Sequence, residues 1–110
     1  MGDSRIEESI KKFMEEIRKS DIYRDYDFQK KRLKQEPELF AKVQEYRKMN
    51  YELQTSAQGD DLLDKMEAFE REHEKFRENP LVDDFLRAEL ALCRMVQEIY
   101  VQITAELDFE

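Results

Sequence analysis

Apolar residues recur at three- and four-residue spacing through most of the chain, which is the period of one face of an α-helix. In the first such segment the apolar positions are Ile6, Ile10, Phe13, Met14 and Ile17. Ser4-Arg5-Ile6-Glu7 has the form of a capping box, in which the Ser4 hydroxyl accepts from the Glu7 N–H. The sequence shows no strand-like alternation of apolar and polar residues. The pattern therefore predicts an all-α fold of about five helices that form an extended bundle.

Short polar or proline-containing segments divide the chain between these helices. Ser20-Asp21 resembles a new N-cap, so we expect the chain to bend there into a second helix. The contacts of that helix would be Ile22, Tyr23, Tyr26 and Leu33. Pro37 suits the first turn of a third helix because proline lacks an N–H. The apolar stripe of the third helix is Leu39, Phe40, Val43, Tyr46 and Leu53, and Gly59 is placed to end it before Asp60 caps the next.

Residues 60–78 carry a heptad-like apolar seam with charges on the other faces. The seam consists of Leu62, Met66, Phe69, His73 and Phe76. Asn79-Pro80 then stops this helix and caps the final one. Because so short a connection favours antiparallel neighbours, we expect residues 60–78 and the last helix to form an αα-hairpin. In that hairpin Cys93 would lie near Met66, and His73 near Leu86.

The last helix, from Asn79 to Leu107, is apolar around most of its circumference. One stripe consists of Val82, Phe85, Leu92, Val96, Ile99 and Ile103, and a second of Leu86, Leu90, Cys93 and Tyr100. At about 1.5 Å per residue the helix is roughly 40 Å long. A compact domain of this length has a radius of gyration of about 13 Å, so the helix rivals or exceeds the width of its own domain. We expect the hairpin to cover the first stripe. The second stripe is then the predicted interface, either with the N-terminal helices or with a second subunit of a dimer.

Composition and charge limit the possible functions. The 110 residues predict a single domain, 1–110, and the 42% charged content favours long solvated helices. The net charge of −8 argues against nucleic acid as a direct partner. The basic run Lys30–Lys34 is a local exception, which we interpret mainly as a solvated helix face. A polar N-terminus and the absence of any long apolar run predict a cytoplasmic protein that does not span a membrane.

Candidate chemical groups are few. His73 is the only histidine and Cys93 the only cysteine, so neither a second Glu-x-x-His pair nor a cysteine cluster can form within one chain. We interpret His73 as a packed structural residue and Cys93 as a small buried hydrophobe. The sequence contains no glycine-rich phosphate loop and no nucleophile motif. We therefore predict no enzyme activity, no cofactor and no metal site.

The order of these signals resembles that of a known family. A helix ending near Ser20 is followed by Tyr23-Arg24-Asp25-Tyr26, a helix start at Pro37-Glu38 and a polar loop around Gly59. The run Asn79-Pro80-Leu81-Val82-Asp83-Asp84-Phe85-Leu86-Arg87-Ala88-Glu89 and the tail Leu92-Cys93-Arg94-Met95-Val96-Gln97-Glu98-Ile99-Tyr100 complete it. Over essentially its whole length the chain resembles the YlbF/YmcA family of small helical bacterial proteins.

The resemblance implies a non-enzymatic regulator or adaptor that acts through protein–protein contacts, as a homo-oligomer or in a complex with a related helical protein. Family members are implicated in competence, sporulation and biofilm formation, in a complex linked to a phosphorelay and to ribonuclease Y-dependent mRNA maturation. Two alternatives remain open. One is an RNA- or ribonuclease-binding module that uses Lys30–Lys34. The other is a metal or iron–sulfur protein that uses Cys93 between subunits, because some members hold such clusters with grouped cysteines.

Overall fold

The computed structural model describes residues 3–56 and 59–108, and within them it is all-α with no strand. The helices are α1 (Ser4–Lys19), α2 (Asp21–Lys34), α3 (Pro37–Ser56), α4 (Gly59–Glu72), α5 (Glu74–Glu78) and α6 (Pro80–Glu106). The predicted all-α class and long C-terminal helix are confirmed. The helix count differs because the segment predicted as one helix over residues 60–78 breaks at His73 into α4 and α5.

Of the first two helix starts, that of α2 follows the predicted signal and that of α1 does not. Ser20 caps α2, and its hydroxyl accepts from the Tyr23 N–H at 3.2 Å. The capping box on Ser4 is wrong: α1 already begins at Ser4, and Asp3 is its N-cap. The Asp3 carboxylate accepts from the Arg5 N–H at 2.9 Å. A carboxylate at this position also complements the positive end of the helix dipole, which a neutral hydroxyl does not.

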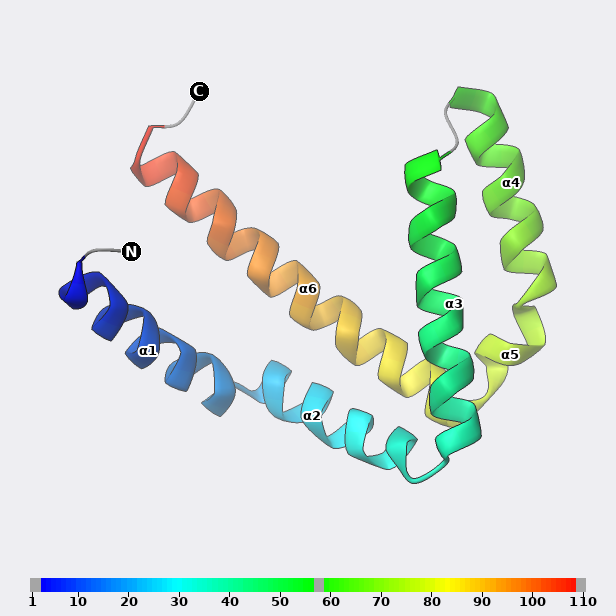
Figure 1. Ribbon diagram of the computed structural model, residues 1–110, viewed down its shortest axis with the longest axis horizontal. Helices are drawn as coiled ribbons and strands as arrows, with labels where there is room; N and C mark the ends of the chain where they lie inside the picture. The colour runs from blue at the N-terminus through cyan, green and yellow to red at the C-terminus, as the bar shows by residue number, and fades with distance from the viewer. Residues whose placement is uncertain (1–2, 57–58, 109–110) are drawn as a thin grey trace.

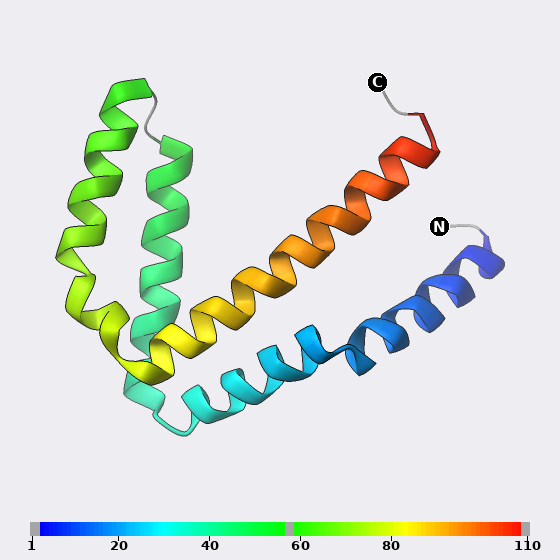
Figure 2. The ribbon, with the colours of Figure 1, turned by 180° about the vertical axis from the view of Figure 1, so that it is seen from behind.

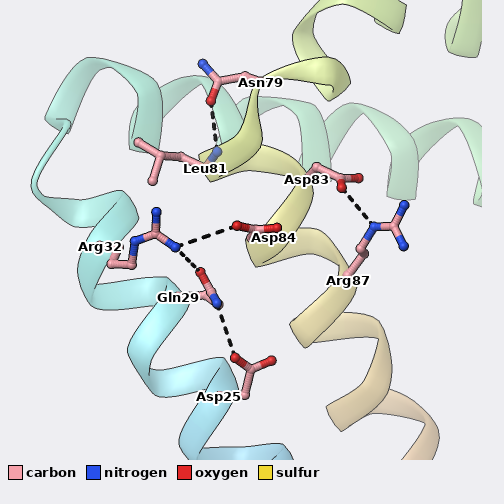
Figure 3. Close-up of polar contacts among 8 residues, drawn as sticks. All are labelled: Asp25, Gln29, Arg32, Asn79, Leu81, Asp83, Asp84 and Arg87. Carbon is pink, nitrogen blue, oxygen red and sulfur yellow. Dashed lines mark hydrogen bonds and ion pairs between the residues drawn. The ribbon is translucent and has the colours of Figure 1, made fainter.

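The later boundaries agree with the sequence at Pro37 and Asn79 but not at Gly59. Pro37 opens α3, and Asn79 caps α6 with its side chain accepting from the Leu81 N–H at 3.0 Å (Figure 3). Gly59 has a φ of +64°, the left-handed region that glycine enters without a steric penalty. Gly59 does not end the third helix as predicted, because α3 is described to Ser56 and Gly59 is the first residue of α4, one position before the predicted start. The side chain of Asp60 lies outside the described part.

The helices form an open V (Figures 1 and 2). One side, the hairpin arm, consists of the antiparallel helices α3 and α4. The other side, the long arm, consists of α1 and α2 in succession together with α6, and α2 packs extensively against α6. The radius of gyration is 17.5 Å, well above the roughly 13 Å of a compact chain of this length. Much of each arm therefore lies far from any shared core.

The core lies where the two arms meet. Its fully buried side chains are Leu33 of α2, Val43 of α3, and Val82 and Phe85 of α6. Tyr26 adds its ring from α2, with its centroid 5.8 Å from that of Phe85. Burying one side chain of this kind stabilises the fold by about 1.5–3 kcal/mol. This small cluster ties three helices together and leaves the outer ends of the arms without a core of their own.

The predicted hairpin between residues 60–78 and the last helix is wrong. α4 packs against α3, whereas α6 packs against α2 and the short α5. The reason is an aromatic cluster in which Tyr46 of α3 contacts the rings of Phe69, His73 and Phe76, at centroid distances of 5.2, 5.3 and 5.5 Å. These seam residues therefore use α3 as their partner, and the expected placement of Cys93 beside Met66 does not occur.

Candidate protein-interaction surface

The apolar face of α1 is uncovered. The five apolar positions of its predicted stripe share one face, as their spacing requires, but none of the α1 residues is buried. Ile6, Ile10, Phe13 and Met14 are exposed, and Ile17 next to the bend is half-buried. α1 continues the arm beyond the bend at Ser20, and its contacts with the rest of the described chain are mainly with the neighbouring α2. The helix therefore presents an apolar stripe without a cover in the described chain.

The second half of α6 is equally uncovered. Buried residues in this helix stop at Ala88. Beyond it Val96 is 52% exposed, Tyr100 67% and Ile103 49%. The cause is a mismatch of length, since α2 has 14 residues and α6 has 27. At about 1.5 Å per residue, α2 spans roughly 21 Å and can cover only about half of α6.

The two uncovered faces lie on the same side of the vertex. Figures 1 and 2 show α1 and the second half of α6 projecting together, away from the hairpin arm. Together they form what we term the open-arm surface, defined by Ile6, Ile10, Phe13, Met14, Leu90, Cys93, Val96, Tyr100 and Ile103. Scattered apolar residues are ordinary on a protein surface, but long stripes on two adjacent helices are typical of an interaction site.

Three of the four predicted interface residues are exposed, and the fourth packs against the core. Leu90 is 50% exposed, and Cys93 and Tyr100 are also exposed. Leu86 instead packs partly buried against the core of its own chain. The interpretation of Cys93 as a buried residue is therefore wrong for the single chain. Val96 and Ile103, assigned by sequence to the covered stripe, are exposed because α4 does not lie over them. The sequence signal for this exposure is length: the helices that pack on α6, namely α2 and α5, are much shorter than α6.

A polar network fixes the long arm at its base (Figure 3). Arg32 of α2 lies 3.6 Å from the Asp84 carboxylate of α6 and donates to the Gln29 side chain. Within α6, Arg87 donates to Asp83 at 2.8 Å. These pairs are largely exposed, and exposed pairs contribute only about 0–1 kcal/mol each. Only the Arg32–Asp84 pair crosses from α2 to α6, and it orients one helix on the other more than it stabilises the fold.

A second ion pair joins the two arms. Nη2 of Arg47 on α3 lies 2.8 Å from Oε2 of Glu89 on α6, although that buried oxygen receives no hydrogen bond of good geometry. Burial raises the pKa of the Glu89 carboxyl above its usual range, and the attraction of Arg47 and Lys30 only partly offsets this. The carboxylate is thus held at the vertex at some cost in desolvation.

The candidate chemical groups occupy structural positions. His73 Nδ1 lies 2.8 Å from the Phe69 carbonyl oxygen, and its ring contacts that of Phe69 at a tilt of 40° with centroids 4.3 Å apart. This agrees with the interpretation of a packed structural histidine. Within residues 3–56 and 59–108, no group of three or more His, Cys, Asp or Glu side chains is arranged to hold a metal ion.

The basic run on α2 is largely engaged within the chain. Lys31 pairs with Asp27 at 2.8 Å, and Arg32 with Asp84 at 3.6 Å. The ammonium groups of Lys30 and Lys34 lie over the rings of Tyr26 and Phe40, at 5.7 and 5.6 Å from the ring centroids. These contacts favour a structural role for the run over an open phosphate-binding face.

Comparison with known proteins gives one match. The family model described as "Control of competence regulator ComK, YlbF/YmcA" matches residues 6–108 of the 110-residue chain. No curated protein and no solved structure matches the chain. In the part of the chain that the structure describes, no helix has both the length and the apolar character needed to cross a membrane.

Proposed function

The chain belongs to the YlbF/YmcA family, whose description is control of a competence regulator, and we propose that it is a non-enzymatic adaptor that acts by binding other proteins. The family description supports a regulatory role. Our proposal further places the protein in the cytoplasm, in the developmental complex that the sequence resemblance implies, with its links to a phosphorelay and to ribonuclease Y-dependent mRNA processing.

The observation that carries this proposal is the open-arm surface. Fully burying one Leu, Ile, Val or Phe side chain contributes about 1.5–3 kcal/mol. Association costs an estimated 4–15 kcal/mol in lost freedom of motion. Because the exposed apolar side chains belong to two long helices, covering several of them together is enough to offset that cost. A protein partner that covers both helices therefore stabilises the chain as it binds.

We propose that the partner at this surface is a second copy of the chain or a closely related one. Two copies related by a two-fold axis would bring α1 and α6 of each into one four-helix arrangement, in which every apolar stripe faces another. In this arrangement Leu90, Cys93 and Tyr100 keep their predicted role as interface residues, and Val96 and Ile103 join them. Leu86 serves the core of its own chain.

Sedimentation equilibrium at low micromolar concentration tests this proposal. We expect a dimer for the unmodified chain and a shift to monomer for Tyr100→Glu and for Val96→Glu. Tyr51→Glu is the matched control, since Tyr51 is exposed on α3, away from the open-arm surface. A monomeric unmodified chain that binds no hydrophobic dye would overturn the proposal, because the stripes would then need no cover.

A pull-down from the native host tests the regulatory complex separately. Tagged unmodified chain and tagged Tyr100→Glu are compared, with Tyr51→Glu again as the control. We expect a ribonuclease or a related helical protein to co-purify with the unmodified chain and with the control variant. Recovery of the chain alone, in every sample, would contradict the proposed complex while leaving self-association untouched.

A further inference from the structure

The outer face of α2 carries an aromatic side chain that the core does not use. α2 turns Tyr26 and Leu33 towards α6, where Leu33 is fully buried. Phe28 points the other way and is 57% exposed. The guanidinium carbon of Arg32 lies 5.7 Å from the centroid of this ring, and the rest of the ring is open to solvent. Aromatic residues are enriched at protein interfaces. Phe28 therefore marks a surface distinct from the open-arm surface.

Phe28 lies in a shallow hollow at the junction of α1 and α2. The hollow has a volume of about 230 Å³ and is lined by Arg18, Tyr23, Arg24, Asp27, Phe28 and Lys31. Small-molecule sites usually measure about 300–1,000 Å³, so this one has room for one or two side chains of a bound segment. Its lining combines two aromatic rings with three cationic side chains and one carboxylate.

The charge around the hollow is opposite to that of the chain. Residues 18–34 carry seven Lys or Arg and three Asp or Glu, a net charge of +4 in a chain of net charge −8. Lys31 is already paired with Asp27 at 2.8 Å. Arg18 and Arg24 make no ion pair with other described residues. Two guanidinium groups beside an exposed ring are thus available to a ligand.

We propose that this hollow binds an acidic segment of a partner protein, with an apolar side chain seated on Phe28 and Tyr23 and carboxylates held by Arg18 and Arg24. Guanidinium groups pair with carboxylates in bidentate fashion, which gives both strength and orientation. The field of the basic segment attracts a segment rich in Asp and Glu and disfavours a basic one.

An acidic protein segment fits this surface better than RNA does. Affinity for single-stranded RNA comes from many phosphate contacts along a basic groove. Here two arginines remain beside the Asp27 carboxylate, and the chain as a whole is acidic. The neighbouring cations Lys30, Arg32 and Lys34 contact Tyr26, Asp84 and Phe40 of the same chain. The number of available cations suits a short acidic stretch.

The test measures binding of the intact chain to labelled probes by fluorescence anisotropy. Two synthetic peptides share phenylalanine at the same positions and carry either glutamate or lysine elsewhere, and a polyuridine RNA is the third probe. The variants are Arg24→Glu and Phe28→Ala. Their matched controls are Arg71→Glu on α4 and Tyr51→Ala on α3, both exposed and remote from the hollow. Circular dichroism and sedimentation confirm that each variant keeps its fold and its oligomeric state.

We expect the glutamate peptide to bind with a Kd below about 1 mM, and both α2 variants to weaken it by at least about fivefold, the effect of losing an interface anchor. The lysine peptide should bind far more weakly, and the controls should behave as the unmodified chain. Absence of glutamate-peptide binding, or equal binding of the lysine peptide, overturns the proposal. RNA binding that Arg24→Glu abolishes also overturns it, and assigns the hollow to nucleic acid. None of these outcomes depends on whether the chain dimerises through its other surface.

Discussion

The guanidinium of Arg47 lies 2.8 Å from the carboxylate of Glu89, and this ion pair joins α3 to α6 where the two arms meet. Other polar contacts of α6, such as that of Asp84 with Arg32, link it to α2 within the long arm. The Arg47–Glu89 pair instead spans the vertex of the V. Its strength therefore bears on the angle between the arms as well as on stability.

We predict that acid strengthens the contribution of Glu89 to folding. Burial raises the folded-state pKa of this carboxyl above its value in the unfolded chain. The stabilising contribution of the protonated form is then fully present below the unfolded pKa and is lost as the pH rises through the folded pKa. Urea unfolding of the unmodified chain and Glu89→Gln should show the unmodified chain gaining relative stability as the pH falls from neutral to 4.5, the ordinary pKa of a glutamate. A relative loss over that interval would contradict the burial argument.

Shortening a buried side chain at the vertex should lower the free energy of unfolding. Leu33 is fully buried among Val43, Val82 and Phe85, so Leu33→Ala removes packed methyl groups and leaves a cavity. We expect it to lower the free energy of unfolding by about 2–5 kcal/mol. Leu63→Ala makes the same chemical change at an exposed position of α4 and should stay within about 0.5 kcal/mol of the unmodified chain. Urea titration measures both, and equal costs would show that the core lies elsewhere.

The first helix should respond to Asp3 and not to Ser4. Asp3 accepts from the Arg5 and Ile6 N–H groups, and replacing such a cap with alanine costs about 0.5–2 kcal/mol. Because no residue of α1 is buried, this cost should appear as local fraying, measured as faster amide hydrogen exchange in its first turn. We expect the effect for Asp3→Ala and little change for Ser4→Ala. A larger effect of Ser4→Ala than of Asp3→Ala would contradict this prediction and support the capping box on Ser4.

The sequence predicted features that depend on neighbouring residues and failed on features that depend on distant ones. The caps at Ser20 and Asn79 and the start at Pro37 follow from local backbone hydrogen bonding, and all three are confirmed. The hairpin partner of residues 60–78 depends on which helix offers a matching surface. Tyr46 offers it from α3, and no periodicity within residues 60–78 encodes that choice.

The exposed surface was predicted in part for the same reason. Two apolar stripes on one helix indicated a partner, which remains a proposal, and Leu90, Cys93 and Tyr100 are exposed. Which half of the first stripe stays uncovered depends on the length of α2 and on the direction of α4. Both are tertiary properties, so Val96 was assigned to the wrong side. The sequence does not predict that the apolar face of α1 is exposed, because the spacing of its apolar residues is that of an ordinary core-facing helix.

Cys93 offers a direct probe of whether the open-arm surface is covered in solution. Its thiol is exposed in the single chain and lies on α6 between Leu90 and Val96. If a second copy covers this face, the rate of thiol alkylation should fall as protein concentration rises through the dimer transition, because only the dissociated chain presents the thiol. The control is Cys93→Ser combined with Ser56→Cys, which moves the thiol to an exposed position at the end of α3. Alkylation of the control should be independent of concentration. A concentration-independent rate for Cys93 in a chain that sediments as a dimer would place the interface on another face and remove Leu90, Cys93 and Tyr100 from it.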